Sequence, residues 1–287
     1  MPATSIVNAL TIDVEDYFQV SAFAPYIARS EWSACECRVE SNVNRILEML
    51  AINNTKATFF TLGWVAERYP QLVRQIVAQG HELASHGYAH ERASDQSEAV
   101  FYADIHLAKM ILEDLSDHEV CGYRAPSFSI GADNLWAFDC LARAGYRYSS
   151  SIYPIRHDHY GMPDSPRFAY EVRPGLMEIP ITTLRMFNRN LPSSGGGYFR
   201  LLPYALSCWM LNRVNSRDGE SGIFYFHPWE IDPMQPRIEG INQKTRFRHY
   251  VNLHRMENRL RHLLADFNWG RMDHIFLASR VMTSESA

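Results

Sequence analysis

The chain has 287 residues, of which 46% are hydrophobic and 21% are charged, as expected for a folded protein with a large core. Its formal net charge of −4 argues against a general nucleic-acid-binding protein, because such proteins are usually basic. No apolar run approaches the roughly 18 residues that a transmembrane helix needs, so no membrane span is expected. The start of the chain lacks the segments of a secretory signal, and five scattered cysteines suggest reduced thiols in the cytoplasm.

Apolar runs alternate with amphipathic segments through the first half of the chain. Buried strands are predicted at residues 6–13, 57–62, 81–86, 121–126 and 146–151. Helices are predicted at residues 43–50, 71–80, 97–115 and 134–145. This alternation is typical of an α/β protein with a parallel sheet or barrel.

The pattern becomes irregular after about residue 155. Residues 156–175 and the glycine-rich stretch at 193–200 are predicted to be loops. Further strands are predicted at residues 176–182 and 274–279, a strand that runs into a loop at 222–232, and one long amphipathic helix at residues 246–267. No change of composition marks a linker, so residues 1–287 are interpreted as one elaborated domain.

Polar and reactive residues follow four of the predicted strands. They are the acids at 13–16, the histidines at 86–90, the segment at 124–126 and His227. In parallel α/β barrels the loops at the carboxyl ends of the strands form the active site. We therefore expect these four segments to converge at one mouth.

The segment HELASHGYAH predicts part of a metal site. His86 and His90 could supply two imidazole nitrogens, and a carboxylate from the acids at 13–16 could supply a third ligand. Such a set leaves one position open for water, as catalytic zinc requires. The alternative is a pair of surface or capping histidines. His81, which directly follows Gly80, is interpreted as a structural histidine.

The acidic segment TIDVEDYF offers two candidates for the carboxylate ligand. If the strand continues through Glu15, that residue shares the face of Asp13; if the chain turns at once, Asp16 could reach the metal instead. The remaining acid could serve as a general base that activates a metal-bound water. A solvated turn with outward acids is the alternative.

Two further segments suggest supporting roles. Arg124 beside a carboxylate would keep it ionised and oriented, and Pro126 would stiffen the loop. His227 at the mouth could protonate a leaving amine. Candidates for stacking against sugar rings are Tyr153, Tyr160, Tyr198 and Trp229.

In chain order these motifs are an acid pair, HxxxH, RxP and a histidine before proline. Their order resembles that of the polysaccharide deacetylase family, also called the NodB-homology domain or carbohydrate esterase family four. The stretches DVEDYFQV, GGGYFRLLPY and KTRFRHYVNL resemble more narrowly the bacterial deacetylases encoded with exosortase and exopolysaccharide systems. With these stretches the resemblance covers nearly the whole chain.

The resemblance implies a distorted, incomplete (β/α) barrel of the NodB-homology type. Its core would cover about residues 5–230, interleaved with a family-specific C-terminal extension at about residues 156–287. The resemblance also implies one divalent metal ion, with Zn²⁺ as the expected ion, and hydrolysis of N-acetyl groups on amino sugars. By motif position the implied roles are general base for Asp13, metal ligands for His86 and His90, orientation of the base for Arg124, and general acid for His227.

The chain departs from the family pattern at three places. The usual pair of adjacent aspartates is replaced, so that Glu15 or Asp16 would be the third ligand. The aromatic residue expected after RxP is replaced by Ser127 and then Phe128, which still offer a backbone N–H for the oxyanion. The Asp-Trp motif is missing, which leaves the carboxylate partner of His227 unassigned.

We therefore expect a hydrolase of C–N bonds other than peptide bonds. Its substrate would be an N-acetylated glycan of an exopolysaccharide, or a lipid-linked precursor. A cytoplasmic protein, or one bound peripherally to the inner membrane, would act before export. The alternatives are an allantoinase-like small-molecule amidohydrolase on the same fold and a catalytically inactive carbohydrate-binding protein.

Overall fold

The computed structural model describes residues 6–158 and 160–277. Its main sheet has the strand order β10-β1-β2-β3-β4-β5-β7-β6, and β11 pairs with the start of β1 on the side of β2. All neighbours in this sheet are parallel except β6 and β7. The strands are β1 (Val7–Val14), β2 (Thr58–Thr61), β3 (Glu82–Ser85), β4 (Gly122–Tyr123), β5 (Tyr148–Ser149), β6 (Tyr170–Arg173), β7 (Leu176–Glu178), β10 (Ile223–Phe226) and β11 (Asn268–Gly270). A separate hairpin is formed by β8 (Thr183–Met186) and β9 (Arg189–Pro192).

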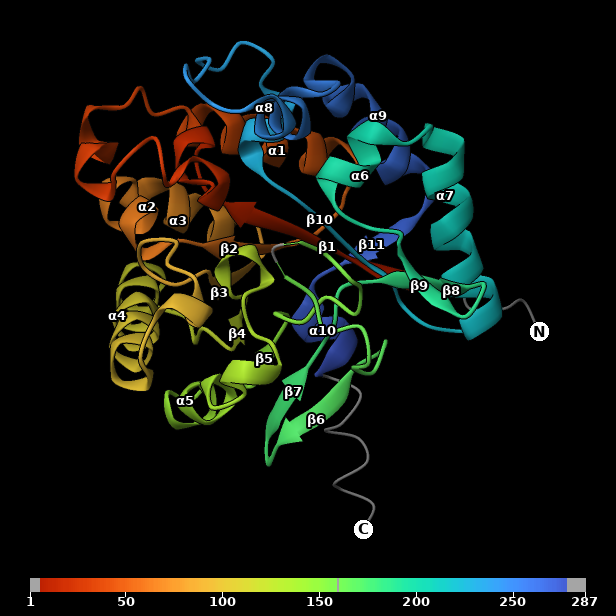
Figure 1. The fold of residues 1–287 in the computed structure, drawn as a ribbon, viewed down its shortest axis with the longest axis horizontal. Helices are drawn as coiled ribbons and strands as arrows, with labels where there is room; N and C mark the ends of the chain where they lie inside the picture. Colours follow the sequence, from red (N-terminus) through yellow and green to blue (C-terminus); the bar gives the residue numbers. More distant parts are fainter. Residues whose placement is uncertain (1–5, 159, 278–287) are drawn as a thin grey trace.

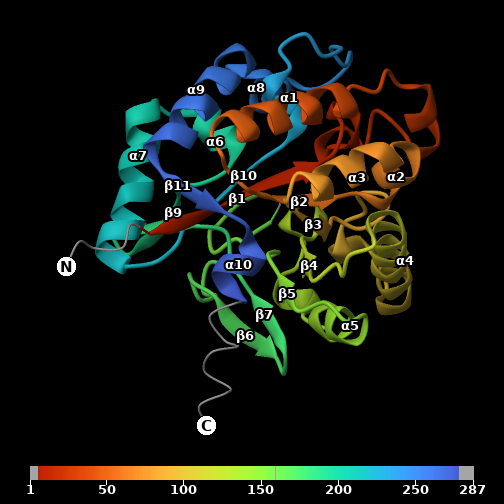
Figure 2. The same ribbon diagram turned by 180° about the vertical axis from the view of Figure 1, so that it is seen from behind.

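Helices surround the sheet in an arc that runs from α7 through α9 and α1 to α4 and α5 (Figure 1). Seen from behind, α10 lies close to β5 and β7 at the inner side of the arc (Figure 2). Among the described residues no helix is long and apolar enough to cross a membrane. The helices are α1 (Val39–Ile52), α2 (Gly63–Arg68), α3 (Pro70–Ala78), α4 (Glu98–Ser116), α5 (Ala137–Arg143), α6 (Gly196–Leu201), α7 (Tyr204–Arg213), α8 (Gln243–Tyr250), α9 (Leu253–Asp266) and α10 (Met272–Phe276).

Alternation along β1 gives the sheet two different faces. Leu10, Ile12 and Val14 point outward and pack against apolar residues of α1, α3 and α9. Ala9 points to the interior, where it joins residues of β2, β3, β7 and β10 in a second core. Asp13 lies an even number of residues farther along and shares the interior face. The last inward residue of β1 is therefore an acid at the mouth.

Helix α1 illustrates why the outer layer forms. Its buried residues Val43, Ile46, Leu47 and Leu50 recur at the spacing of one helical face. That face covers the outward residues of β1 and β2 in one core cluster. The packing fixes the strands whose carboxyl ends carry the polar segments.

The sheet is open, which confirms the predicted α/β class and incomplete barrel. Antiparallel β6 ends one side of the strand order, and β10 ends the other. Whether residues 1–287 fold as one domain stays a prediction, although strands from both halves pair in one sheet.

Four predicted elements of the second half are wrong. The loop predicted at 156–175 contains a strand, because Tyr170–Arg173 form β6. The predicted strand at 274–279 is helical over its described part, because α10 runs from Met272 to Phe276, and residues 278–279 lie outside the described residues. The single helix predicted at 246–267 is interrupted, since Asn252 adopts a left-handed conformation with φ 52° between α8 and α9. The predicted glycine-rich loop at 193–200 mostly forms α6.

Candidate active site and metal centre

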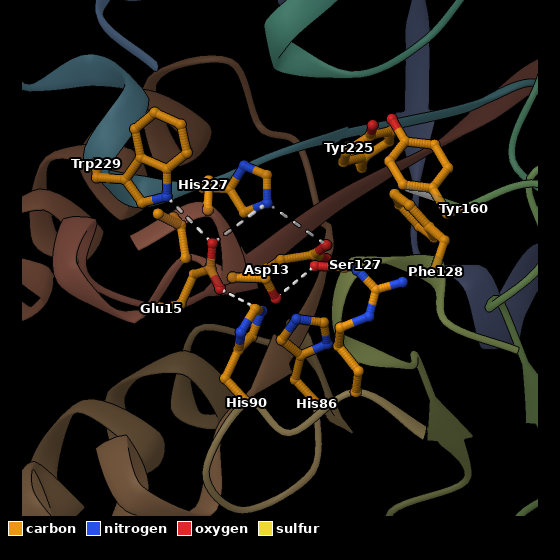
Figure 3. Close-up of a pocket in the computed structure, with 14 residues that line it drawn as sticks. Asp13, Glu15, His86, His90, Ser127, Phe128, Tyr160, Tyr225, His227 and Trp229 are labelled. Atoms are coloured by element: carbon orange, nitrogen blue, oxygen red, sulfur yellow. Dashed lines mark hydrogen bonds and ion pairs between the residues drawn. The ribbon is translucent and has the colours of Figure 1, made fainter. Parts of the chain in front are cut away.

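A cavity of about 280 Å³ opens at the carboxyl ends of β1, β3 and β10 (Figure 3). It brings together segments that are far apart in the chain, as expected from the parallel sheet. The residues that line it are Asp13, Glu15, Val20, Ser21, Ala22, His86, His90, Arg92, Ser127, Phe128, Tyr160, Tyr225, His227 and Trp229.

Glu15, His86 and His90 form a buried cluster on one wall of this cavity. Each offers one ligand atom, and these atoms lie within 4.8 Å of one another. A carboxylate and two imidazoles are a ligand set suited to zinc, with room for further ligands. Among the described residues this is the one group of three such side chains that could hold a metal.

His86 presents a nitrogen to the cluster in a fixed tautomer. Its Nδ1 lies 2.8 Å from the carbonyl oxygen of Arg124, which can only accept. Nδ1 therefore carries the proton and donates it, and Nε2 keeps its lone pair for a metal. Burial lowers the pKa of His86 to about 4, although the negative charge of Asp13 opposes this shift. The ring is held neutral, as a metal ligand must be.

The turn between the two histidines depends on a carboxylate from α4. Oδ2 of Asp104 accepts the backbone N–H of Tyr88 at 3.1 Å. Gly87 has φ +75°, and a Cβ there would lie 2.8 Å from the same oxygen. The close approach and the positive φ both require glycine. His90 follows with φ 51°, which turns its side chain toward Glu15.

The side chains of Glu15 and His90 are placed to bind a cation rather than to form a regular hydrogen bond with each other. Oε2 of Glu15 lies 2.7 Å from Nε2 of His90 but has no hydrogen-bond partner of regular geometry among the described residues. Nδ1 of His90 is also buried and unpartnered there. The indole N–H of Trp229 donates to Oε1 of Glu15 at 3.2 Å and orients the carboxylate. Burial opposes ionisation of Glu15, but the positive charges of His90 and His227 hold its pKa well below its usual range.

The structure is at odds with Asp16 as the third ligand, because its carboxylate is used elsewhere. Oδ1 accepts the N–H of Tyr17 at 2.8 Å, and Oδ2 accepts those of Arg38 at 2.6 Å and Val39 at 2.8 Å. Val39 begins α1, so Asp16 caps that helix. Burial raises the pKa of Asp16 to about 6 against the effect of these bonds.

Asp13 is held by a buried arginine. Nη1 of Arg124 donates to Oδ1 of Asp13 at 2.6 Å and to Oγ1 of Thr11 at 2.8 Å. The rest of the guanidinium donates to Ser150, and its plane lies 4.1 Å from the ring centre of Phe60. These contacts hold the Arg124 guanidinium in place, and its bond to Oδ1 in turn fixes the direction of the Asp13 carboxylate.

His227 is oriented by a carboxylate three residues farther along. Oε1 of Glu230 lies 2.8 Å from Nδ1 of His227, so Nδ1–H donates to it. Nε2 then faces the site, 3.5 Å from Oε1 of Glu15 and 4.0 Å from Oδ2 of Asp13. Burial disfavours the charged ring, but Glu15, Glu230 and Asp13 together raise the pKa of His227 to about 9.

Glu230 is itself paired with a second buried arginine. Nε of Arg200, from α6, donates to its Oε2 at 2.7 Å. The Arg200 guanidinium also donates to the carbonyl oxygens of His249 and Val251. Gly196 lies so close that a Cβ there would sit 2.1 Å from Oε1 of Glu230. This explains part of the glycine run that was predicted to be a loop.

The proposed substrate residues have different positions. Ser127 lines the cavity with φ 54°, and its hydroxyl donates to that of Ser21 at 2.7 Å. The N–H of Phe128 donates to the carbonyl of Ala125 at 3.0 Å, so it is not free for an oxyanion. Trp229 lines the cavity but is stacked on His227 with 5.1 Å between ring centres. Tyr153 is fully buried, contrary to a stacking role.

Sequence reasoning missed Glu230, Arg200, Thr11 and Ser150. Only Glu230 had a local signal, because a proline at the first helical position and a glutamate two residues later mark a helix start. His81, by contrast, lies outside the cluster, where its Nδ1 accepts the N–H of Ala57 at 3.2 Å.

The family model described as polysaccharide deacetylase matches residues 32–149, which include His86, His90 and Arg124. Residues 32–149 are therefore similar to the polysaccharide deacetylase family. A second model, described as a domain of unknown function (DUF3473), matches residues 150–277, which include His227 and Arg200. The acids at 13–16 precede both matches.

Curated deacetylases resemble the family segment. A peptidoglycan-N-acetylglucosamine deacetylase of Bacillus cereus is 34% identical over 94 residues, 32% of this chain and 34% of that protein. A peptidoglycan deacetylase of Helicobacter pylori is 29% identical over 122 residues, 39% of this chain and 38% of that protein. A chitooligosaccharide deacetylase of Sinorhizobium fredii is 49% identical over 45 residues, 16% of this chain and 21% of that protein. The chain thus matches at most about two fifths of the length of these relatives.

Solved structures of deacetylases share the fold. A candidate polysaccharide deacetylase from Mycobacterium smegmatis aligns with a TM-score of 0.64 at 21% identity, over 99% of this chain and 93% of that one. The peptidoglycan deacetylase PdaC from Bacillus subtilis aligns with a TM-score of 0.53 at 12% identity, over 100% of this chain and 97% of that one. At these identities the likeness establishes the fold alone.

Proposed function

We propose that the protein is a metal-dependent N-deacetylase that removes acetyl groups from amino sugars of an exopolysaccharide or its precursor. One observation carries the proposal: Asp13, which Arg124 holds from behind, and His227 border the same cavity as the Glu15–His86–His90 cluster. The names of the curated relatives, which act on peptidoglycan and chitooligosaccharides, support this substrate class.

Glu15, His86 and His90 would hold a divalent cation, with Zn²⁺ as the expected ion. When bound, such an ion polarises the acetamide carbonyl and lowers the pKa of a water molecule. The chain prepares this site in two ways. The carbonyl of Arg124 fixes the ring of His86, and the indole of Trp229 fixes the carboxylate of Glu15.

Asp13 is suited to accept the proton of the attacking water. Its Oδ1 is engaged by Arg124, whereas Oδ2 faces His227 across the cavity at 4.0 Å. Arg124 thus leaves one oxygen for proton transfer and keeps the carboxylate directed at the cluster. A positioned base of this kind typically contributes about 10²–10⁴-fold to the rate.

His227 is suited to protonate the departing amine. Its Nδ1–H is committed to Glu230, so that Nε2 is the nitrogen that meets the substrate. When protonated, it can deliver its Nε2 proton to the sugar nitrogen as the C–N bond breaks. The products are acetate and a free amino sugar, and the backbone N–H of Ser127 is the remaining candidate donor to the oxyanion.

The test measures acetate release together with bound metal. Wild-type protein would be incubated with N-acetylglucosamine oligomers, an N-acetylated exopolysaccharide and allantoin. We expect acetate from the glycans, loss of acetate release in Asp13→Asn protein, and one equivalent of metal in both proteins. Turnover of allantoin, without acetate release from any glycan, would contradict the proposal.

A further inference from the structure

A second cavity of about 430 Å³ adjoins the candidate active site. The two cavities share Tyr160 and Tyr225, which stand on the side of the first cavity away from Glu15 and His90 (Figure 3). The lining residues of the second cavity are His157, Tyr160, Gly197, Tyr198, Leu201, Tyr225, Lys244, Phe247, Arg248 and Val251. All of them lie beyond the segment matched by the deacetylase family model.

The shared wall consists of well-packed rings. Tyr160 stacks on His157 with 3.9 Å between ring centres, and on Tyr153 with 5.9 Å. Tyr225 is buried and meets Phe128 edge to face at 4.9 Å. Because Tyr160 and Tyr225 are held in place and line both cavities, one ligand could contact them with two neighbouring groups, one in each cavity.

Helix α8 supplies the outer side of the second cavity. Lys244, Phe247 and Arg248 occur at the spacing of one helical face, and all three line the cavity. Phe247 is 57% exposed, which is costly for a large apolar side chain that has no ligand. Across from it lie Tyr198 and Leu201 of α6, and Leu201 is 48% exposed.

One acid pairs with both cations of this face and balances one of their two charges. Asp158 lies 2.5 Å from Nζ of Lys244 and 3.3 Å from Nη1 of Arg248. These pairs join the segment before residue 159 to α8. Lys244 and Arg248 have more N–H groups than Asp158 can accept, so they can still donate hydrogen bonds to the oxygens of a ligand.

We infer that the second cavity is a subsite for the sugar next to the one that is deacetylated. The exposed ring of Phe247 and the half-buried ring of Tyr198, together with a few hydrogen-bond donors, match the apolar faces and hydroxyl rim of a pyranose. The inference rests on the proposed function, because it takes the first cavity to hold the reacting sugar. It makes the substrate an oligosaccharide or polymer rather than a single sugar.

The test is a binding measurement that does not depend on turnover. Asp13→Asn protein loaded with Zn²⁺ would be titrated with N-acetylglucosamine oligomers from the dimer to the pentamer by calorimetry. We expect the longer oligomers to bind more tightly than the dimer. Adding Phe247→Ala or Tyr198→Ala should weaken binding of the tetramer by about tenfold, or about 1.4 kcal/mol, while affecting the dimer less.

Phe187→Ala is the matched control, because Phe187 is 85% exposed on the β8–β9 hairpin, away from both cavities. It should leave the difference between tetramer and dimer unchanged. Equal affinities for all lengths, equal effects of Phe247→Ala and Phe187→Ala, or no binding of any oligomer would each overturn the inference. Length-dependent binding without acetate release by the wild-type protein would keep the subsite and reject the proposed deacetylation.

Discussion

Arg124 and Asp13 form an ion pair in which both side chains are almost completely buried, with 2.6 Å between Nη1 and Oδ1. The pair joins the end of β4 to the end of β1, two strands that are not neighbours in the sheet. A buried charge that loses its partner is strongly destabilising, whereas the intact pair adds little to stability by itself. The pair is therefore better understood as a device that orients Asp13.

The first prediction concerns the stability of this pair. Arg124→Met should lower the free energy of unfolding by about 3–5 kcal/mol, because it leaves the Asp13 carboxylate buried without a counter-charge. The double variant Asp13→Asn/Arg124→Met should be less destabilised than the sum of the single changes. Urea denaturation followed by circular dichroism measures all four proteins. Strict additivity would mean that the two side chains do not interact energetically.

The second prediction separates proton transfer from metal binding. Asp13→Asn should retain the metal but lose about 10²–10⁴-fold in kcat, because an amide cannot accept the proton of water. Metal content by elemental analysis and acetate release would be measured on the same sample. A variant that lost its metal as well would place Asp13 among the ligands instead.

The third prediction distinguishes the two neighbouring acids. Glu15→Gln should weaken metal binding together with activity, as should His86→Ala and His90→Ala. Asp16→Asn should keep its metal and instead lower the free energy of unfolding by about 1 kcal/mol, because it weakens the cap of α1. Competitive titration with a chelating dye gives the metal affinities. Normal affinity in Glu15→Gln protein would reject the ligand set.

The fourth prediction concerns the pair behind His227. Glu230→Gln should lower kcat with little change in KM, because the single oxygen of an amide cannot accept from both Arg200 and the Nδ1–H of His227. Nitrogen NMR of labelled histidine should show a mixture of tautomers in the variant and a single tautomer in the wild type. Arg200→Lys, which retains the charge but not the fork of donors, should have a smaller effect. An unchanged tautomer with reduced kcat would argue for a purely structural defect.

The fifth prediction is a dependence of stability on pH. Burial lowers the pKa of His81 to about 4, so the folded protein keeps this ring neutral below pH 6.5, where the unfolded chain binds a proton. The free energy of unfolding should therefore fall as pH drops from about 6.5 to about 4, by up to about 3 kcal/mol. His81→Asn keeps an acceptor for the N–H of Ala57 but does not titrate. The difference in free energy of unfolding between wild-type and His81→Asn protein should change by up to about 3 kcal/mol between pH 6.5 and pH 4. A difference that stays constant over this pH range would show that His81 does not titrate in this way.

The strands and helices of the first half of the chain could be predicted from the sequence, because the local hydrophobic pattern and the tertiary packing agree there. The apolar runs before Asp13, His86, Arg124 and His227 form neighbouring or nearby strands, which is why the four segments meet. The choice between Glu15 and Asp16 could not be made, since it depends on whether the backbone N–H groups of Arg38 and Val39 capture one acid. That contact spans more than twenty residues and has no periodic signal.

The second half was harder to predict for a physical reason. A short apolar run such as HIFLAS is compatible with a strand or a buried helix, and only its packing against the sheet decides. Asn252 interrupts α8 and α9 by a conformation that asparagine adopts more easily than most residues but does not require. The contacts of Arg200 with Glu230 and of Asp158 with α8 likewise depend on tertiary structure.

The pairing of β1 with β10 and β11 has a consequence for how the chain folds. Glu15 and Trp229, which meet in the site, are separated by 214 residues. Strand β1 therefore pairs with β10 and β11 only after these much later segments have been synthesised. During synthesis the edge of β1 opposite β2 remains unpaired, and such an edge is prone to association with other chains. A topology of high contact order also implies slow folding. The three proposed metal ligands lie within the first ninety residues, so an ion bound early would join the ends of β1 and β3 across β2 before β10 is made.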